Sequence, residues 1–94
     1  MTHYDFFFKC GKCGAISSVR YRVPNQDRVW VTLSCKNCES PMLKVYNDNY
    51  SSGNRYKVWD IVRERYILGD SNNTVPRDVF WAWVTDHGGD RYDE

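Results

Sequence analysis

Long apolar runs are missing from this chain of 94 residues. Its longest uninterrupted apolar stretch is residues 79–84, far short of the ~20 residues needed to span a bilayer. The N-terminus also lacks the basic segment and the longer apolar stretch of a secretory signal. We therefore expect no membrane partner, and a cytoplasmic or otherwise intracellular location in a reducing compartment.

The chain also has no large excess of positive or negative charge, because it contains 13 Lys and Arg and 12 Asp and Glu, for a net charge of +1. Tight non-specific DNA binding is thereby disfavoured, since it scales with the number of phosphates neutralised. A phosphate loop, a nucleophile elbow and paired carboxylates are absent, and the two histidines, His3 and His87, lie far apart in sequence. These absences predict a protein that is not an enzyme and has no small-molecule substrate.

Aromatic residues, by contrast, are plentiful. They make up 16% of the chain, and hydrophobic residues make up 41%, which is too much for a disordered tail. The length allows one small domain, and a chain of this size buries only a thin core. The first half alone, about 45 residues, would bury too little apolar surface to be secure, so the second half of the chain is expected to pack on it.

Four cysteines supply the clearest motif. Cys10 and Cys13 form one C-x-x-C pair, Cys35 and Cys38 form a second, and 21 residues separate the pairs. Two tight turns of this kind aim four sulfurs at one ion, which is close to the spacing of four-cysteine zinc sites. We expect one structural Zn²⁺ held by all four cysteines, with no open position for a substrate.

Three other uses of these cysteines compete with zinc. Iron takes the same four ligands and is the less favoured metal. Two disulfides would suit a secreted domain. A thioredoxin-like redox site would require one motif at the start of a helix in a βαβ unit, and neither pair has that context. Because Glu39 follows the second pair where Gly14 follows the first, the second turn is expected to differ slightly.

Alternating apolar and polar residues around the cysteines predict strands. In 19–23 and again in 29–33 every second residue is apolar. Pairing Val23 with Val29 would place these apolar residues on one face, whereas a one-residue slip would not. We therefore expect a hairpin of these two segments, with further strands at 4–9 and 42–46.

A strand, a C-x-x-C turn, a hairpin, a second C-x-x-C turn and a strand follow one another over about residues 4–47. This order resembles the zinc-ribbon family, on the evidence of Cys10, Cys13, Cys35 and Cys38 with the hairpin between them. Zinc ribbons occur in transcription factors, polymerase subunits, ribosomal proteins and nucleic-acid enzymes. The resemblance implies that functional neighbourhood and no particular role. A treble-clef fold is disfavoured because Pro41 and a strand-like segment follow the second pair.

The second half of the chain predicts two helices. Apolar residues at helical spacing before Gly69 favour one helix over 55–68. Pro76 and an acidic first turn suit the start of a second helix, which ends at 88–89, although strand formers in 79–85 leave a strand as the alternative. Residues that would share the apolar face of the second helix are Val79, Phe80, Trp83 and Val84.

Residues 47–54 are polar and predict a linker, and 90–94 are expected to fray. The resulting fold class is a small α+β metal-bound domain. It has a β zinc ribbon at 1–50 and a helical extension at 51–94, packed on the ribbon as one compact unit. Trp59, Phe80 and Trp83 are expected in the core, whereas Trp81 falls off the shared helical face.

Two surfaces are candidates for a partner. Arg22 would lie opposite Trp30 on the outer face of the predicted hairpin, which gives a basic and aromatic patch suited to nucleic acid or simply a solvated face. Trp81 is a candidate anchor for a protein partner. The residues assigned to these surfaces are Arg20, Arg22, Trp30, Lys44, Tyr46 and Trp81.

Three functional hypotheses follow. The favoured one is a non-enzymatic adaptor or regulator that docks on a protein, in transcription or other nucleic-acid machinery; a viral factor aimed at a host complex is one form of it. The second is a direct nucleic-acid binder that uses the hairpin face. The third is a thiol redox or metal-handling protein. Zinc with four thiolates would lower the net charge from +1 to about −1, which favours the protein partner.

Overall fold

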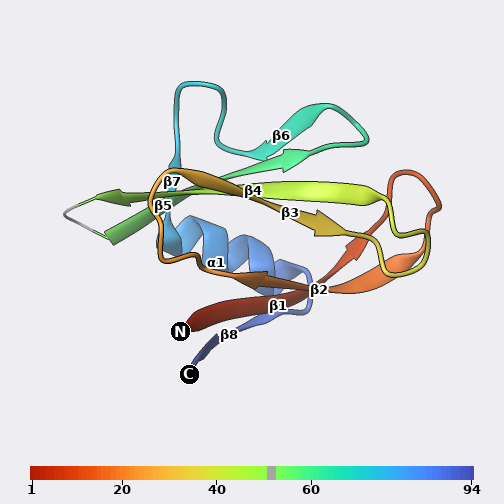
Figure 1. The fold of residues 1–94 in the computed structure, drawn as a ribbon, viewed down its shortest axis with the longest axis horizontal. Coiled ribbons are helices and arrows are strands. Elements are labelled where there is room, and N and C mark those ends of the chain that lie inside the picture. Colours follow the sequence, from red (N-terminus) through yellow and green to blue (C-terminus); the bar gives the residue numbers. More distant parts are fainter. Residues whose placement is uncertain (51–52) are drawn as a thin grey trace.

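The computed structural model describes residues 1–50 and 53–94, and it consists of two antiparallel sheets with one helix packed against them (Figure 1). The first sheet has the order β2-β1-β8 and the second the order β3-β4-β5-β6, with β7 paired to β5. The strands are β1 (Thr2–Lys9), β2 (Ile16–Arg22), β3 (Val29–Ser34), β4 (Pro41–Tyr50), β5 (Gly53–Asp60), β6 (Arg65–Leu68), β7 (Val75–Pro76) and β8 (Asp90–Asp93), and the helix is α1 (Arg77–Asp86).

The core lies between the two sheets and is rich in aromatic rings. Alternate residues are buried along β2 of the first sheet and β5 of the second, as in half-buried strands. Helix α1 adds Phe80, whose ring stacks on Tyr56 at 4.4 Å and meets Tyr4 edge-on at 4.9 Å between ring centroids. The fully buried side chains of this core include Tyr4, Phe6, Tyr21, Leu43, Val45, Tyr56, Val58, Phe80 and Val84.

The predicted helix over 55–68 is wrong, and the fold is therefore mostly β with one short helix rather than a ribbon followed by two helices. This segment forms β5 and β6 around a turn. Along β5, Tyr56, Val58 and Asp60 are buried, and Lys57 and Trp59 between them are more exposed, so the period is two. The chain turns where Glu64 adopts a positive φ of 54°, which an α-helix does not contain.

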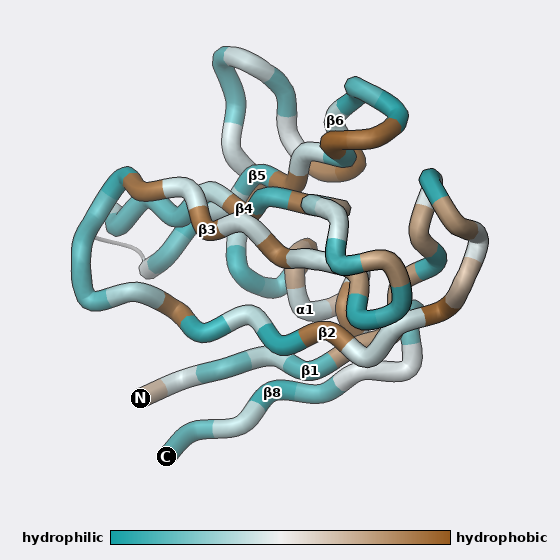
Figure 2. Tube along the Cα trace, turned by 45° about the vertical axis from the view of Figure 1, so that its right-hand side comes forward, coloured by the Kyte–Doolittle hydropathy of each residue, from teal (hydrophilic) through white to brown (hydrophobic). Residues whose placement is uncertain are grey.

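The predicted pairing of 19–23 with 29–33 is also wrong, although both segments are strands. Strand β2 pairs with β1, which sets Tyr21 opposite Tyr4, and β3 pairs with β4, which sets Val31 opposite Val45. The two segments lie in different sheets and bury their apolar faces against each other across the core. The connection between them is a hydrophilic stretch that leaves one layer and enters the other (Figure 2).

Helix α1 confirms the predicted second helix and excludes a strand at 79–85. Phe80 and Val84 are buried and Trp83 packs beside them, whereas Val79 is exposed on the solvent side of the predicted apolar face. The helix ends where Gly88 and Gly89 donate their N–H groups to carbonyls of its last turn. Within residues 1–50 and 53–94, no helix has the length and apolar character to cross a membrane.

The C-terminal tail does not fray as expected, because 90–93 form β8 and pair with β1. The Met1 amino group and the Glu94 carbonyl close this edge. The predicted linker at 47–54 is replaced by strand pairing, with Asp48 opposite Arg55 and Asn49 opposite Asn54; its residues 51–52 lie outside the described part. Each sheet consequently contains strands from both halves of the chain.

Candidate metal centre and binding surfaces

Two C-x-x-C turns close two hairpins at the same end of the molecule (Figure 1). The turn with Cys10 and Cys13 joins β1 to β2, and the turn with Cys35 and Cys38 joins β3 to β4. These hairpins belong to different sheets. The cysteine cluster is therefore a point at which both layers of the fold meet.

The two turns share one backbone conformation. Each carries the same pair of backbone hydrogen bonds: Cys10 N–H to Ala15 C=O at 2.9 Å with Gly14 N–H to Cys10 C=O at 3.0 Å, and Cys35 N–H to Ser40 C=O at 2.9 Å with Glu39 N–H to Cys35 C=O at 2.8 Å. Gly14 has φ of 78° and Glu39 has φ of 62°. The expectation of a different second turn is wrong, because Glu39 adopts the left-handed conformation that glycine adopts in the first.

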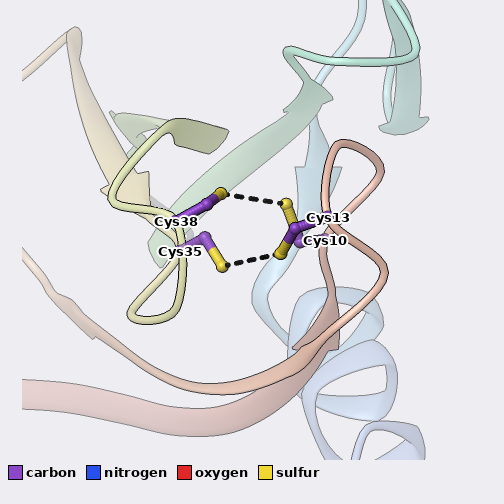
Figure 3. Close-up of side chains that lie close together, drawn as sticks. All are labelled: Cys10, Cys13, Cys35 and Cys38. Atoms are coloured by element: carbon purple, nitrogen blue, oxygen red, sulfur yellow. Dashed lines mark hydrogen bonds between the residues drawn. The ribbon is translucent and has the colours of Figure 1, made fainter.

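The four sulfur atoms converge on one point. All four Sγ atoms lie within 4.8 Å of one another, and the closest contacts join the two turns, at 3.8 Å for Cys10–Cys38 and 3.7 Å for Cys13–Cys35 (Figure 3). A tetrahedron with metal–sulfur bonds of about 2.3 Å has edges of about 3.8 Å. A disulfide would need about 2.05 Å. The cluster thus has the dimensions to hold one metal ion, and its sulfurs are not cross-linked.

Polar groups around the sulfurs favour their thiolate form. Lys12 N–H donates to Cys10 Sγ at 3.3 Å. Ser17 Oγ accepts the Lys36 N–H at 3.2 Å and lies 3.4 Å from Cys35 Sγ. The Ser17 hydroxyl, followed by nearby backbone N–H groups, lowers the pKa of Cys35 to about 6. A thiolate is the form that ligates a metal, so the buried Ser17 supports the second turn as a metal ligand pair.

The structure separates the residues that were predicted to bind a partner. Arg20 and Arg22 lie on the outer face of the first sheet, where Arg20 donates to both carboxylate oxygens of Asp5 at 2.8 and 3.0 Å and lowers the pKa of that carboxyl. Arg22 lies opposite His3, so its predicted position opposite Trp30 is wrong. Trp81 is 43% exposed and lies on α1, whereas the two arginines lie on β2.

Trp30, Lys44 and Tyr46 do come together, on the outer face of the second sheet. Tyr46 lies opposite Trp30 on β3, with ring centroids 5.1 Å apart. The Lys44 amine lies 4.4 Å from the centre of the Trp30 ring. Trp30 remains 38% exposed, so this part of the face is accessible to a ligand.

Strands β5 and β6 extend this face with residues that the sequence did not assign to it. In the strand register Lys57 lies opposite Tyr46, and Trp59 lies opposite both Lys44 and Tyr66. Trp59 is half-buried there, not a core residue of a helix as predicted. The sequence signal that could have placed these residues is the period of two along β5, in which residues 55, 57 and 59 alternate with the buried residues 56, 58 and 60. We call this surface the aromatic face: Trp30, Lys44, Tyr46, Lys57, Trp59 and Tyr66.

Comparison with protein-family models, with curated proteins and with solved structures finds no match. The clustering of the four cysteines is compatible with a zinc ribbon. The function must therefore be inferred from the metal cluster and the exposed surfaces themselves.

Proposed function

We propose that this protein is a non-enzymatic, zinc-stabilised module that binds single-stranded nucleic acid on its aromatic face. The observation that carries the proposal is the grouping of four rings and two lysines on the outer surface of one sheet. Single strands bind proteins by stacking bases on aromatic side chains while cations contact the backbone. The aromatic face offers both kinds of group.

Zinc is the metal that best fits the cluster. Four thiolates in a tetrahedral arrangement are typical of structural zinc, and they leave no coordination position for a substrate. Iron can take the same ligands, and metal analysis of the purified protein distinguishes the two. The ion would tie the β3–β4 turn to the β1–β2 turn, and so fix the strands that carry Trp30, Lys44 and Tyr46.

Binding would require the lysines to exchange one contact for another. In the free protein the Lys44 amine lies over Trp30 and the Lys57 amine lies 4.9 Å from the Tyr46 ring centre. Exposed cation–π contacts are worth about 0.5–1 kcal/mol, whereas stacking of a base contributes about 1–3 kcal/mol. A base can therefore replace the amine on the ring, and the released amine can contact a phosphate.

The small number of lysines on this face predicts a weak dependence on salt. Each phosphate neutralised on a single strand changes the logarithmic salt slope by about −0.7, so Lys44 and Lys57 together give a slope of about −1.4. Affinity would come mainly from stacking. This is compatible with a protein whose net charge is close to zero.

Fluorescence anisotropy with a labelled single-stranded DNA, over a range of salt concentrations, tests the proposal. Trp30→Ala should weaken binding by about 1–3 kcal/mol, and Lys44→Ala should reduce the salt slope by about 0.7. Arg22→Ala is the matched control, because it removes an exposed cation from the other sheet. Binding that Trp30→Ala leaves unchanged, or that Arg22→Ala weakens equally, would contradict the proposal.

A protein-docking adaptor is the second candidate, and the exposure of Trp81 favours it. This ring is 43% exposed on α1 and lines a pocket of about 350 Å³ with Arg55, Arg77 and Arg91. Exposed tryptophans beside arginines are typical of interface anchors. Affinity capture from a native lysate with the wild type and with Trp81→Ala would show whether any partner depends on this ring.

A further inference from the structure

A pocket of about 550 Å³ lies between the end of β1, the second half of α1 and the β5–β6 hairpin. One wall is aromatic: the His87 ring lies 4.6 Å from the Trp83 ring and 5.9 Å from the Phe8 ring between centroids. Ile67 contributes to the apolar lining. The volume is in the range of ligand sites, about 300–1,000 Å³. None of the residues of the aromatic face lines this pocket.

The charged residues around the pocket leave an excess of positive charge. Asp60 is 2% exposed and accepts from Arg63, both from its N–H at 3.0 Å and from Nη1 at 2.8 Å, so this pair is neutral overall. Lys9 and Arg65 also line the pocket and are exposed. Across residues 1–50 and 53–94, the side chains of Lys9 and Arg65 have no ion pair and no hydrogen bond. An anionic group would satisfy both.

His87 adds a directional group to the aromatic wall. Its Nδ1 lies 2.9 Å from the Trp83 carbonyl oxygen, which can only accept, so Nδ1 carries the proton that it donates. In the neutral ring Nε2 is then an acceptor, and no group in the described part of the chain donates to it. A ligand with an N–H or amino group beside a flat ring would complete this site.

We propose that this pocket binds a nucleoside monophosphate group, with its base against Phe8, Trp83 and His87 and its phosphate at Lys9 and Arg65. A flat ring, an amino group and a dianionic phosphate match the aromatic wall, the His87 acceptor and the cations Lys9 and Arg65. The site goes beyond the proposed function, since the sequence predicted no small-molecule substrate and the aromatic face is a separate surface. Strand β6 separates them: Arg65 lines the pocket, and the next residue, Tyr66, belongs to the aromatic face.

Isothermal titration with deoxyadenosine monophosphate tests the proposal on the zinc-loaded protein. Lys9→Ala and Arg65→Ala should each weaken binding by about ten- to hundredfold, because one charge-assisted hydrogen bond contributes about 1.5–3 kcal/mol. Arg22→Ala, at an exposed cation outside the pocket, should have no effect. Deoxyadenosine and inorganic phosphate, each lacking half of the ligand, should bind at least tenfold more weakly than the nucleotide.

The proposal is overturned by a dissociation constant weaker than about 1 mM, by equal binding of deoxyadenosine, or by binding that both pocket variants leave unchanged. Trp30→Ala should not alter nucleotide binding, so failure of the pocket and failure of the aromatic face are distinguishable. Competition by 5′-phosphorylated and 5′-hydroxyl oligonucleotides then identifies the source of the ligand. Displacement by the phosphorylated strand alone assigns the site to a strand end, and displacement by neither assigns it to free nucleotide.

Discussion

At the scale of single residues, Glu39 has a backbone conformation that its side chain disfavours. Its φ is 62°, where Gly14 of the first cysteine turn has φ of 78°. The left-handed region costs a non-glycine residue roughly 1–2 kcal/mol. The hydrogen bond from Glu39 N–H to Cys35 C=O, at 2.8 Å, requires this conformation. The second turn therefore forms at a conformational cost that the first does not have.

Replacing Glu39 with glycine should stabilise the protein by about 1 kcal/mol, because glycine relieves this cost and offsets part of the gain with its own chain entropy. Gly14→Ala should destabilise the protein by about 1–2 kcal/mol for the opposite reason. Urea unfolding of the metal-loaded variants measures both changes, and the metal content of the variants should equal that of the wild type. Loss of stability in Glu39→Gly would show that the glutamate side chain has a compensating role.

The four cysteines were predictable from spacing, and the strain at Glu39 was not. The two intervals between cysteines specify which sulfurs can meet. The identity of a turn residue is a weaker guide, because metal binding and paired strands can hold a non-glycine residue at positive φ. The sequence therefore indicated the cluster of four cysteines and missed the similarity of the two turns.

Tyr4 and Tyr21 are buried in the core, and within residues 1–50 and 53–94 their hydroxyl groups have no hydrogen-bond partner. Burial raises the pKa of both well above the ordinary value of 10.0. Since the folded state keeps these phenols neutral, their contribution to stability is fully present below about pH 10 and is lost as pH rises toward the raised pKa. Alkaline pH should therefore unfold the protein as these phenols ionise.

Ultraviolet titration of the tyrosines measures this effect. Tyr4 and Tyr21 should ionise only together with the loss of the circular dichroism signal of the fold. Tyr21→Phe should raise the pH of alkaline unfolding, whereas Tyr50→Phe, at an exposed ring, should not. Ionisation of all seven tyrosines in one reversible step near pH 10, with the fold retained, would contradict the burial of these phenols.

At the scale of elements, residues 55–68 show why helical spacing misled. Val58, Ile61 and Val62 fit one helix face, but Tyr56 and Val58 fit a strand with period two equally well. Interactions with other parts of the chain decide between helix and strand here. Strand β4 offers β5 a full set of paired positions, and Asp60 accepts the Arg63 N–H at 3.0 Å to fix the turn.

Partner choice between strands was also beyond the sequence pattern. Alternation in 19–23 and 29–33 correctly predicted two strands with one apolar face each. The alternation is the same whether the two strands pair within one sheet or face each other from two sheets, because Val19 and Leu33 are buried in either arrangement. Strand β2 pairs instead with β1, and β3 pairs with β4. A short cysteine turn joins the two strands of each pair. Short turns favour neighbouring strands as partners.

Helix α1 allows a test with adjacent residues. Phe80 is fully buried against Tyr56 and Tyr4, so Phe80→Ala should cost about 3–5 kcal/mol of unfolding free energy. Trp81→Ala changes the next residue, whose ring is exposed, and should cost no more than about 0.5 kcal/mol. Chemical denaturation of both variants gives the comparison. Similar losses would place Trp81 in the core and remove it as a protein-binding candidate.

At the scale of the whole molecule, the cysteine cluster joins the two layers, and the strand order joins the two halves of the chain. Cys10 and Cys13 come from the hairpin of the first sheet, and Cys35 and Cys38 from that of the second. The first sheet needs β8 from the end of the chain, and β4 needs β5 from beyond residue 50. Each sheet therefore combines strands from both halves of the chain.

Removing the metal should therefore unfold the entire protein in one step. Structural zinc contributes on the order of 10–16 kcal/mol of apparent binding free energy, comparable to or larger than the 5–15 kcal/mol that typically stabilises a domain. Far-ultraviolet circular dichroism reports the strands, and near-ultraviolet circular dichroism reports the packed rings around Phe80. Both signals should fall together when a chelator is added.

Cys35→Ser should behave like the chelated protein, and Ser34→Ala, at an exposed neighbouring position outside the cluster, should behave like the wild type. Coincident transitions would show that the metal supports α1 as well as the strands, because the Phe80 ring packs against Tyr4 and Tyr21 of the first sheet and Tyr56 of the second. Loss of the strand signal with retention of the near-ultraviolet signal would instead show that the helix and its aromatic neighbours form a core that is stable without metal.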